Sequence, residues 1–158
     1  FLVYGLPSLA ARLRQTMHTA AELAKYLAGH PAVDHVRYPG LESHPQHQLA
    51  RKQMRSYDGS FAPSSLLYFV LKGTPDEAKR KGMKLMNWLA EHALSYTLAV
   101  SLGHCKTLIE HPSSMTHSPI AVEDQVKAGI DPGGVRIACG LEEPAILIEE
   151  MEKGLKQI

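Results

Sequence analysis

The chain has 158 residues, 44% hydrophobic and 21% charged, which is the composition of one globular domain with enough apolar side chains for a core. Its net charge is +1 and the charged residues are interspersed, so the sequence lacks the basic patches of a nucleic-acid-binding protein. No apolar stretch is long enough to cross a bilayer, and no membrane partner is expected. Two cysteines, Cys105 and Cys139, favour free thiols in a reducing, cytoplasmic setting.

The N-terminal region predicts a long helix. The opening Phe1-Leu2-Val3-Tyr4 has neither an initiating methionine nor the features of a signal peptide, and indicates the middle of a longer polypeptide. From Ser8 to Gly29, apolar residues recur at three- and four-residue spacing, and Pro7 suits a first helical turn. The positions expected to be buried are Leu9, Leu13, Met17, Ala20, Leu23 and Leu27.

Shorter elements come next in the chain. His30-Pro31 ends the helix, and Val33 to Tyr38 predicts a short strand that the turn pair Pro39-Gly40 closes. A basic helical segment is expected from about Gln46 to Arg55. The run Leu66 to Leu71 is apolar and aromatic throughout, which is typical of a well-buried strand.

A helix with a strong start signal follows this strand. Thr74 can cap it, Pro75 occupies the first helical position, and Glu77 completes a capping box. Part of its buried face is expected from Met83, Leu85, Met86 and Leu89. A second apolar strand, Tyr96 to Val100, then leads directly into Ser101-Leu102-Gly103. A small polar residue and a glycine at the end of a strand are well placed for a site.

The C-terminal region completes a single α/β domain. After an irregular stretch rich in proline and serine, a short helix is expected from Val122 to Ala128, ending at Gly129. Gly134 to Cys139 predicts the last strand, and Pro144 begins a closing helix. The buried residues of that helix should be Leu147, Ile148, Met151, Leu155 and Ile158. Strands interspersed with helices, without a repeat or a linker, describe a two-layer α/β or α+β fold.

The histidines and cysteines form no recognisable site by spacing. The histidines considered as metal ligands are His44, His47, His104, His111 and His117. None of them stands at ligand spacing from a cysteine or a carboxylate, so no metal site is predicted. Cys105 follows His104 directly, but a catalytic thiol needs a base placed beside it in space, and we interpret Cys105 as an ordinary small buried residue.

Arg136 is the most informative single residue. It lies inside an otherwise apolar strand, where alternation places it on the same face as Gly134 and Ala138, and such small neighbours leave room for a ligand. A guanidinium over this hollow presents a fork of donors that matches a carboxylate. An interior ion pair with Glu110 or Glu142 is the alternative interpretation, and the pattern alone leaves both open.

Ordered motifs across almost the whole chain resemble the cystathionine γ-synthase and methionine γ-lyase family of PLP-dependent enzymes. In the C-terminal half the motifs are Ala99-Val100-Ser101-Leu102-Gly103, Thr107-Leu108-Ile109, His111-Pro112-Ser113-Ser114-Met115-Thr116-His117, Gly129-Ile130, Val135-Arg136 and Gly140-Leu141-Glu142. In the N-terminal half they are Gly5-Leu6-Pro7-Ser8-Leu9, His30-Pro31-Ala32-Val33, Tyr38-Pro39-Gly40-Leu41 and His44-Pro45.

The resemblance implies the small C-terminal domain of a fold-type I PLP enzyme, with a mainly antiparallel sheet packed against helices. Residues 1–158 would form this domain, which begins with the long inter-domain helix at about residues 8–29. The Schiff-base lysine belongs to a larger N-terminal cofactor domain, and no segment here resembles the family's Ser-x-Thr-Lys motif. The chain alone is therefore expected to bind no PLP and to be inactive, while the whole protein would form dimers that pair into a homotetramer.

By the same resemblance, Arg136 would bind the α-carboxylate of an amino-acid substrate, with Ser101 and the backbone at Leu102 lining the site. Catalytic residues are not expected in this chain. Ala138 departs from many relatives, which carry a serine there, but this leaves the arginine fork intact. Val100 would be a specificity position, because cystathionine-processing members often have glutamate there, whereas an apolar side chain suits an uncharged substrate tail.

The sequence therefore predicts part of an enzyme of sulfur-amino-acid metabolism or transsulfuration. The reaction would be γ-elimination or γ-replacement, with methionine γ-lyase-like chemistry ahead of O-acetylhomoserine sulfhydrylation and of cystathionine synthesis or cleavage. The alternative is a stand-alone, non-catalytic module that binds an amino acid or mediates oligomerisation.

Overall fold

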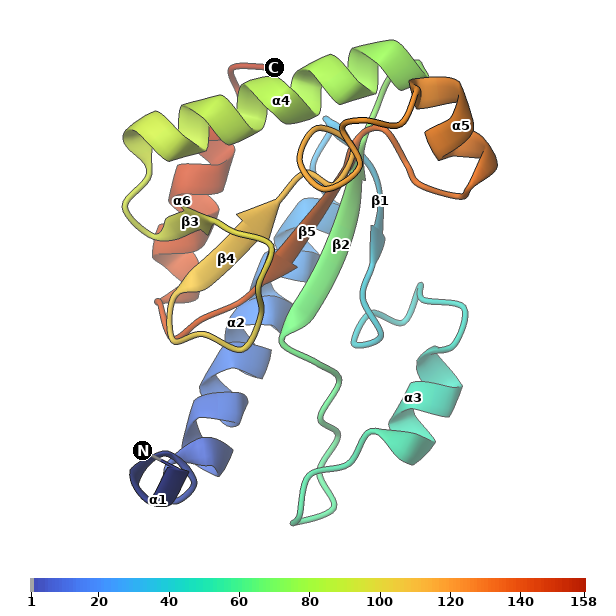
Figure 1. The fold of residues 1–158 in the computed structure, drawn as a ribbon. Helices are drawn as coiled ribbons and strands as arrows, with labels where there is room; N and C mark the ends of the chain where they lie inside the picture. The colour runs from blue at the N-terminus through green and yellow to red at the C-terminus, as the bar shows by residue number, and fades with distance from the viewer. Residues whose placement is uncertain (1) are drawn as a thin grey trace.

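The computed structural model describes residues 2–158, so that Phe1, the first residue of the apolar opening run, lies outside the described part. Figure 1 shows the elements around one sheet. In chain order they are α1 (Leu2–Gly5), α2 (Leu9–Ala28), β1 (Val33–Arg37), α3 (His47–Gln53), β2 (Leu66–Leu71), α4 (Pro75–His92), β3 (Tyr96–Leu98), β4 (Thr107–Glu110), α5 (Val122–Lys127), β5 (Gly134–Ala138) and α6 (Pro144–Leu155).

The strands form one mixed sheet in the order β1-β2-β5-β4-β3. β1 with β2, β2 with β5 and β5 with β4 are antiparallel pairs, whereas β3 and β4 run parallel. The predicted α/β class with a mainly antiparallel sheet is confirmed. β4 is a strand that the sequence does not predict, because its four residues are few and show no alternation of apolar and polar side chains.

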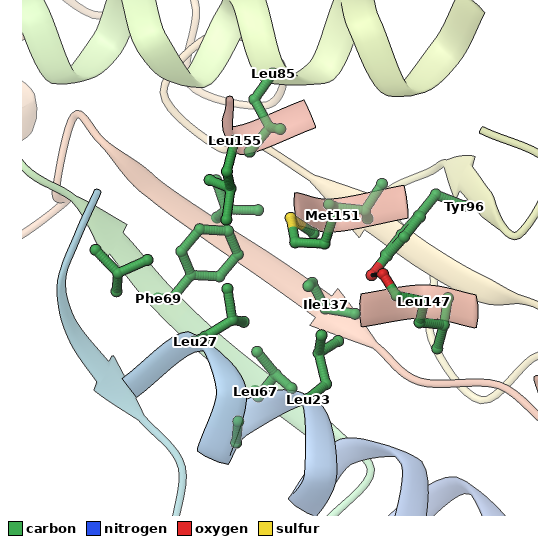
Figure 2. Packing of buried hydrophobic residues seen from close by; sticks show 14 of the residues in the cluster. Leu23, Leu27, Leu67, Phe69, Leu85, Tyr96, Ile137, Leu147, Met151 and Leu155 are labelled. Carbon is green, nitrogen blue, oxygen red and sulfur yellow. Dashed lines mark hydrogen bonds between the residues drawn. The ribbon is translucent and has the colours of Figure 1, made fainter. Parts of the chain in front are cut away.

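The core lies between one face of the sheet and the helices α2, α4 and α6. α2 and α6 lie behind the sheet in Figure 1, and α4 crosses its upper end. Figure 2 shows the side chains that meet there, with Phe69 and Ile137 of the sheet among leucines of the three helices. The hydroxyl of Tyr96 donates a hydrogen bond to the carbonyl of Leu147 at 2.9 Å, so the polar end of this buried ring is satisfied.

The long N-terminal helix is confirmed, but its first turns are not buried. Ser8 is the N-cap and α2 begins at Leu9, so Pro7 precedes the helix and is not in its first turn. Leu9 and Leu13 are 40% and 45% exposed, because this end of α2 extends past the edge of the sheet and has no layer to cover it. Met83 of α4, also expected to be buried, is 44% exposed.

The remaining predicted elements are present with boundaries that shift by a few residues at their ends. The predicted capping box of α4 is confirmed, since the backbone N–H of Thr74 donates to the carboxylate of Glu77 at 2.9 Å. β3 ends at Leu98 and not at Val100. None of the helices in residues 2–158 is long and apolar enough to cross a membrane.

Candidate functional site

Arg136 lies on the sheet face that α2, α4 and α6 leave uncovered. Its strand neighbours Val135 and Ile137 are fully buried in the core, and side chains alternate along a strand, so Arg136 points to the opposite face. The strand register aligns Arg136 with Tyr68 on one side and with Glu110 on the other. The segments that follow β3 and β4 pass over this face in Figure 1.

Two contacts hold the guanidinium of Arg136. Its Nη1 lies 3.2 Å from Oε1 of Glu110 in an ion pair, and its Nη2 donates to the carbonyl of Ser101 at 3.0 Å. The side chain of Arg136 is 26% exposed and that of Glu110 is 7% exposed. Within residues 2–158, the buried Nε of Arg136 and the buried Oε2 of Glu110 have no hydrogen-bond partner. A guanidinium carries five N–H donors, so this arginine can still bind a carboxylate.

The hollow expected beside Arg136 is partly filled. A β-carbon built on Gly134 would lie 1.6 Å from the hydroxyl oxygen of Tyr68, so the tyrosine occupies the space that the glycine leaves. Burial and the nearby charge of Asp131 raise the pKa of Tyr68 to about 12, and the phenol stays neutral. The expectation of open space over this glycine is therefore wrong, because Tyr68, which lies opposite Arg136 in the neighbouring strand, extends its ring diagonally over Gly134.

The loop after β3 brings Ser101 to Arg136. The contact uses the backbone carbonyl of Ser101. Val100 and Leu102 flank it and are 54% and 58% exposed. Gly103 has a φ of +76°, a left-handed conformation that glycine adopts without steric cost, and it turns the chain toward β4. The structure thus places Ser101 and Arg136 together, with Val100 and Leu102 on the exposed surface beside them.

His111 fixes the segment that follows Glu110. Its imidazole is fully buried, with Nε2 at 2.7 Å from the carbonyl of Pro132 and Nδ1 at 2.7 Å from the hydroxyl of Ser114. Since a carbonyl can only accept, Nε2 carries the proton and Nδ1 accepts from the serine. Burial lowers the pKa of His111, which favours this neutral form. The ring thereby ties the end of β4 to the start of β5.

Within residues 2–158, no group of three or more His, Cys, Asp or Glu side chains is arranged to hold a metal ion. His104 accepts a hydrogen bond from the backbone N–H of Lys106, and His117 pairs with the hydroxyl of Thr116. Of the two glutamates considered as partners of Arg136, Glu110 makes the ion pair, whereas Glu142 accepts hydrogen bonds from Thr107. The role of His111 as a buried anchor was missed, because nothing in its local sequence marks it as buried.

Both cysteines line one cavity of about 130 Å³ beside the site, between α2 and the loop after Ser101. Cys105 is exposed, so the expectation that it is a buried residue is wrong, because it lies in the loop after Ser101 and not in a strand. Cys139 is buried, and both are free thiols. Burial raises the pKa of Cys139 to about 12, so this thiol stays protonated and unreactive. The prediction of free thiols is confirmed.

The described residues do not fit PLP by themselves. A Schiff-base lysine lies in an enclosed pocket, but no lysine within residues 2–158 is buried. A phosphate also needs a cradle of backbone N–H groups, usually a glycine-rich loop between a strand and a helix. Gly133 and Gly134 instead lie at the start of β5, where the backbone enters the sheet.

The fold and the ordered motifs match a class of PLP-dependent enzymes. The chain belongs to the family described as Cys/Met metabolism PLP-dependent enzyme, whose sequence profile matches residues 1–156. It is 36% identical over its full length to an L-methionine γ-lyase of Fusobacterium nucleatum subsp. polymorphum, and covers 36% of that protein. It is 41% identical to an L-methionine γ-lyase of Porphyromonas gingivalis, in an alignment that covers 98% of this chain and 35% of that protein.

A solved structure shows the same fold. The cystathionine γ-lyase of Micromonospora echinospora superposes with a TM-score of 0.79 at 32% identity, and the match covers 97% of this chain and 36% of that one. The chain thus spans about a third of the length of the relatives it matches. The family resemblance seen in the sequence is confirmed.

Proposed function

We propose that residues 1–158 form the C-terminal, substrate-binding domain of a PLP-dependent enzyme that acts on a sulfur amino acid. The single observation that carries this proposal is that the guanidinium of Arg136 lies on the open sheet face and keeps N–H donors that Glu110 and Ser101 do not use. The chain that holds it belongs to a family of PLP-dependent enzymes. The rest of the polypeptide would hold the cofactor and its lysine. The alternative, a stand-alone binding module, keeps the carboxylate site but lacks such a partner domain.

Arg136 binds the α-carboxylate of the substrate in this proposal. Glu110 and the carbonyl of Ser101 use two of its N–H donors, and the remaining donors include the buried Nε. A carboxylate that accepts two of these N–H groups is fixed in both position and orientation. The loop at Ser101 and Leu102 lines the same site. The chain would thereby hold the amino acid in one orientation against the cofactor of the other domain.

The preferred substrate is methionine, and the reaction is γ-elimination. Val100 is apolar and 54% exposed at the edge of the site, where it suits a substrate tail without a charge. Several similar relatives are named L-methionine γ-lyase, whereas others are named cystathionine β-lyase or cystathionine γ-lyase. Cystathionine chemistry is therefore a next candidate, together with O-acetylhomoserine sulfhydrylation, whose substrate tail is also uncharged.

The exposed apolar surface at the N-terminal end suits contact with the rest of the protein. Four residues of this surface are more than 60% exposed: Leu2, Val3, Tyr4 and Leu6. Apolar side chains gathered in this way are typical of a surface that another domain or subunit covers. We propose that this end of the chain packs in a cytoplasmic homo-oligomer, a dimer of dimers.

The test is a product assay of the whole polypeptide that contains this chain, after the reading frame upstream of Phe1 has been examined for a cofactor domain. Methionine, cystathionine and O-acetylhomoserine with sulfide are supplied separately. Methanethiol with 2-oxobutyrate, cysteine with 2-oxobutyrate, or homocysteine then distinguishes the three reactions. We expect methanethiol from methionine. A reading frame that encodes no cofactor domain, with amino-acid binding but no product, would favour the stand-alone module.

A further inference from the structure

We propose that Glu110 is a positioning residue for Arg136, whose guanidinium it holds in the orientation that receives a substrate carboxylate. This inference rests on the proposed function, because it assumes that Arg136 binds that carboxylate. Glu110 lies opposite Arg136 in the register of β4 and β5, and its Oε1 is 3.2 Å from Nη1 of the arginine. It would act through the arginine and would not touch the substrate.

The ion pair is poorly suited to a purely stabilising role. Glu110 is 5% exposed, and its Oε2 has no hydrogen-bond partner within residues 2–158. A carboxylate that is buried with one oxygen unsatisfied carries a desolvation cost, and an apolar residue of similar size is often at least as stabilising. The Lys153–Glu149 pair on the surface of α6 involves no such cost, since both side chains are more than half exposed. The cost at Glu110 is therefore better explained by orientation of the arginine.

Glu110 is also a more rigid support than the second contact of Arg136. Every residue of β4 is buried, and the imidazole of His111, the next residue, donates a hydrogen bond through Nε2 and accepts one at Nδ1. Ser101, in contrast, lies in an exposed loop and offers only a backbone carbonyl. Without Glu110 the guanidinium would keep this one tether and could rotate away from the substrate. Removal of Glu110 would then weaken the binding of ligands that carry a carboxylate.

Glu110 and Ser101 contact different nitrogens of the guanidinium, which supports the same conclusion. Glu110 binds Nη1 and the Ser101 carbonyl binds Nη2, which together define the plane of the group and leave Nε–H without a protein acceptor. Nε is itself buried, so a substrate carboxylate would approach the second N–H of Nη1 and of Nη2, which the contacts with Glu110 and Ser101 do not use. Pre-organisation of this kind lowers the entropy that binding would otherwise cost.

The experiment compares two matched inhibitors of the holoenzyme. L-Norleucine has the length of methionine and an α-carboxylate, whereas pentylamine is the same molecule without the carboxylate. We expect Glu110→Ala to raise the inhibition constant of L-norleucine by about tenfold, a usual size for coupling between residues in contact, and to leave that of pentylamine unchanged. Glu110→Gln keeps an oxygen acceptor in place and should show a smaller increase. Glu149→Ala removes the exposed glutamate and should change neither constant.

Arg136→Ala, measured in parallel, separates the carboxylate-binding role of Arg136 from the positioning role of Glu110. If it leaves the constant for L-norleucine unchanged, the proposed role of Arg136 fails. If it raises that constant while both Glu110 variants match the unmodified enzyme, only the positioning role fails. Equal increases for both inhibitors in the Glu110 variants would indicate general damage and also overturn the inference. Should Glu110→Ala not fold, Glu110→Gln carries the test, and in an Arg136→Ala background it should have no further effect.

Discussion

The imidazole of His111 fills the space beside Gly82, so that a β-carbon built on this α4 glycine would lie 2.3 Å from Nε2 of the histidine. Alanine is favoured over glycine in a helix by about 1 kcal/mol, but here the added methyl group meets a buried ring that two hydrogen bonds hold in place. We expect Gly82→Ala to lower the free energy of unfolding by about 1–3 kcal/mol, as overpacking does, in urea titrations.

A matched control for this prediction is Gly29→Ala. Gly29 is the C-cap of α2 with a φ of −93°, and a β-carbon there would meet only the carbonyl oxygen of Tyr26, at 3.7 Å. This change should stay within about 0.5 kcal/mol of the unmodified protein. Equal stabilities of the Gly82 and Gly29 variants would mean that His111 can move aside and does not anchor the end of β4.

The buried His111 also predicts a loss of stability in mild acid. Burial lowers its pKa in the folded state below the unfolded value of about 6.5, so the unfolded chain takes up a proton at higher pH than the folded one. The contribution is complete above about pH 6.5 and is lost as the pH falls toward the folded pKa. Urea unfolding between about pH 7.5 and pH 5.5 should show this decrease.

His111→Gln is the variant that assigns this pH dependence. It is expected to be less stable than the unmodified protein at neutral pH, because the two buried hydrogen bonds are disturbed. Its stability should, however, decrease less steeply as the pH falls, since the group that must take up a proton is gone. The same slope in both proteins would assign the effect to other histidines.

The sequence predicted the elements whose patterns are local and missed those that depend on register. The apolar runs of β2 and β5 identified two central strands, and a lone arginine in one of them marked the candidate site. The choice between Glu110 and Glu142 as partner of Arg136 needed the pairing of β4 with β5, which joins segments far apart in the chain. Tyr68 over Gly134 depends on the register of β2 in the same way.

Val100 is predicted to influence the choice of substrate. Its side chain is 54% exposed beside Ser101, so a glutamate there can be accommodated without burial of an unpaired charge. We expect Val100→Glu in the holoenzyme to raise kcat/KM for cystathionine, whose distal ammonium group it could pair with, relative to kcat/KM for methionine. Val100→Gln is the uncharged control of the same size. An unchanged ratio of the two kcat/KM values in Val100→Glu would remove Val100 from the specificity positions.

Arg136→Ala tests the proposed carboxylate site most directly. The variant removes the proposed partner of the substrate carboxylate, and loss of one partner of a buried charge pair costs several kcal/mol. We therefore expect kcat/KM of the holoenzyme to fall by about a thousandfold or more. The absorbance of the bound cofactor should stay near normal. Arg136→Lys keeps the charge but loses the fork of donors, and should recover only part of the loss.

Arg37→Ala provides the matched control for Arg136. Arg37 lies on the same sheet face, opposite Tyr68 in the strand register, and its ion pair with Asp131 at 3.0 Å is partly exposed. Its removal takes away an equal charge from this face without touching Glu110 or Ser101, so kcat/KM should remain near that of the unmodified enzyme. Equal losses in the Arg37 and Arg136 variants would mean that the general positive charge of this face, and not a specific fork at Arg136, attracts the substrate.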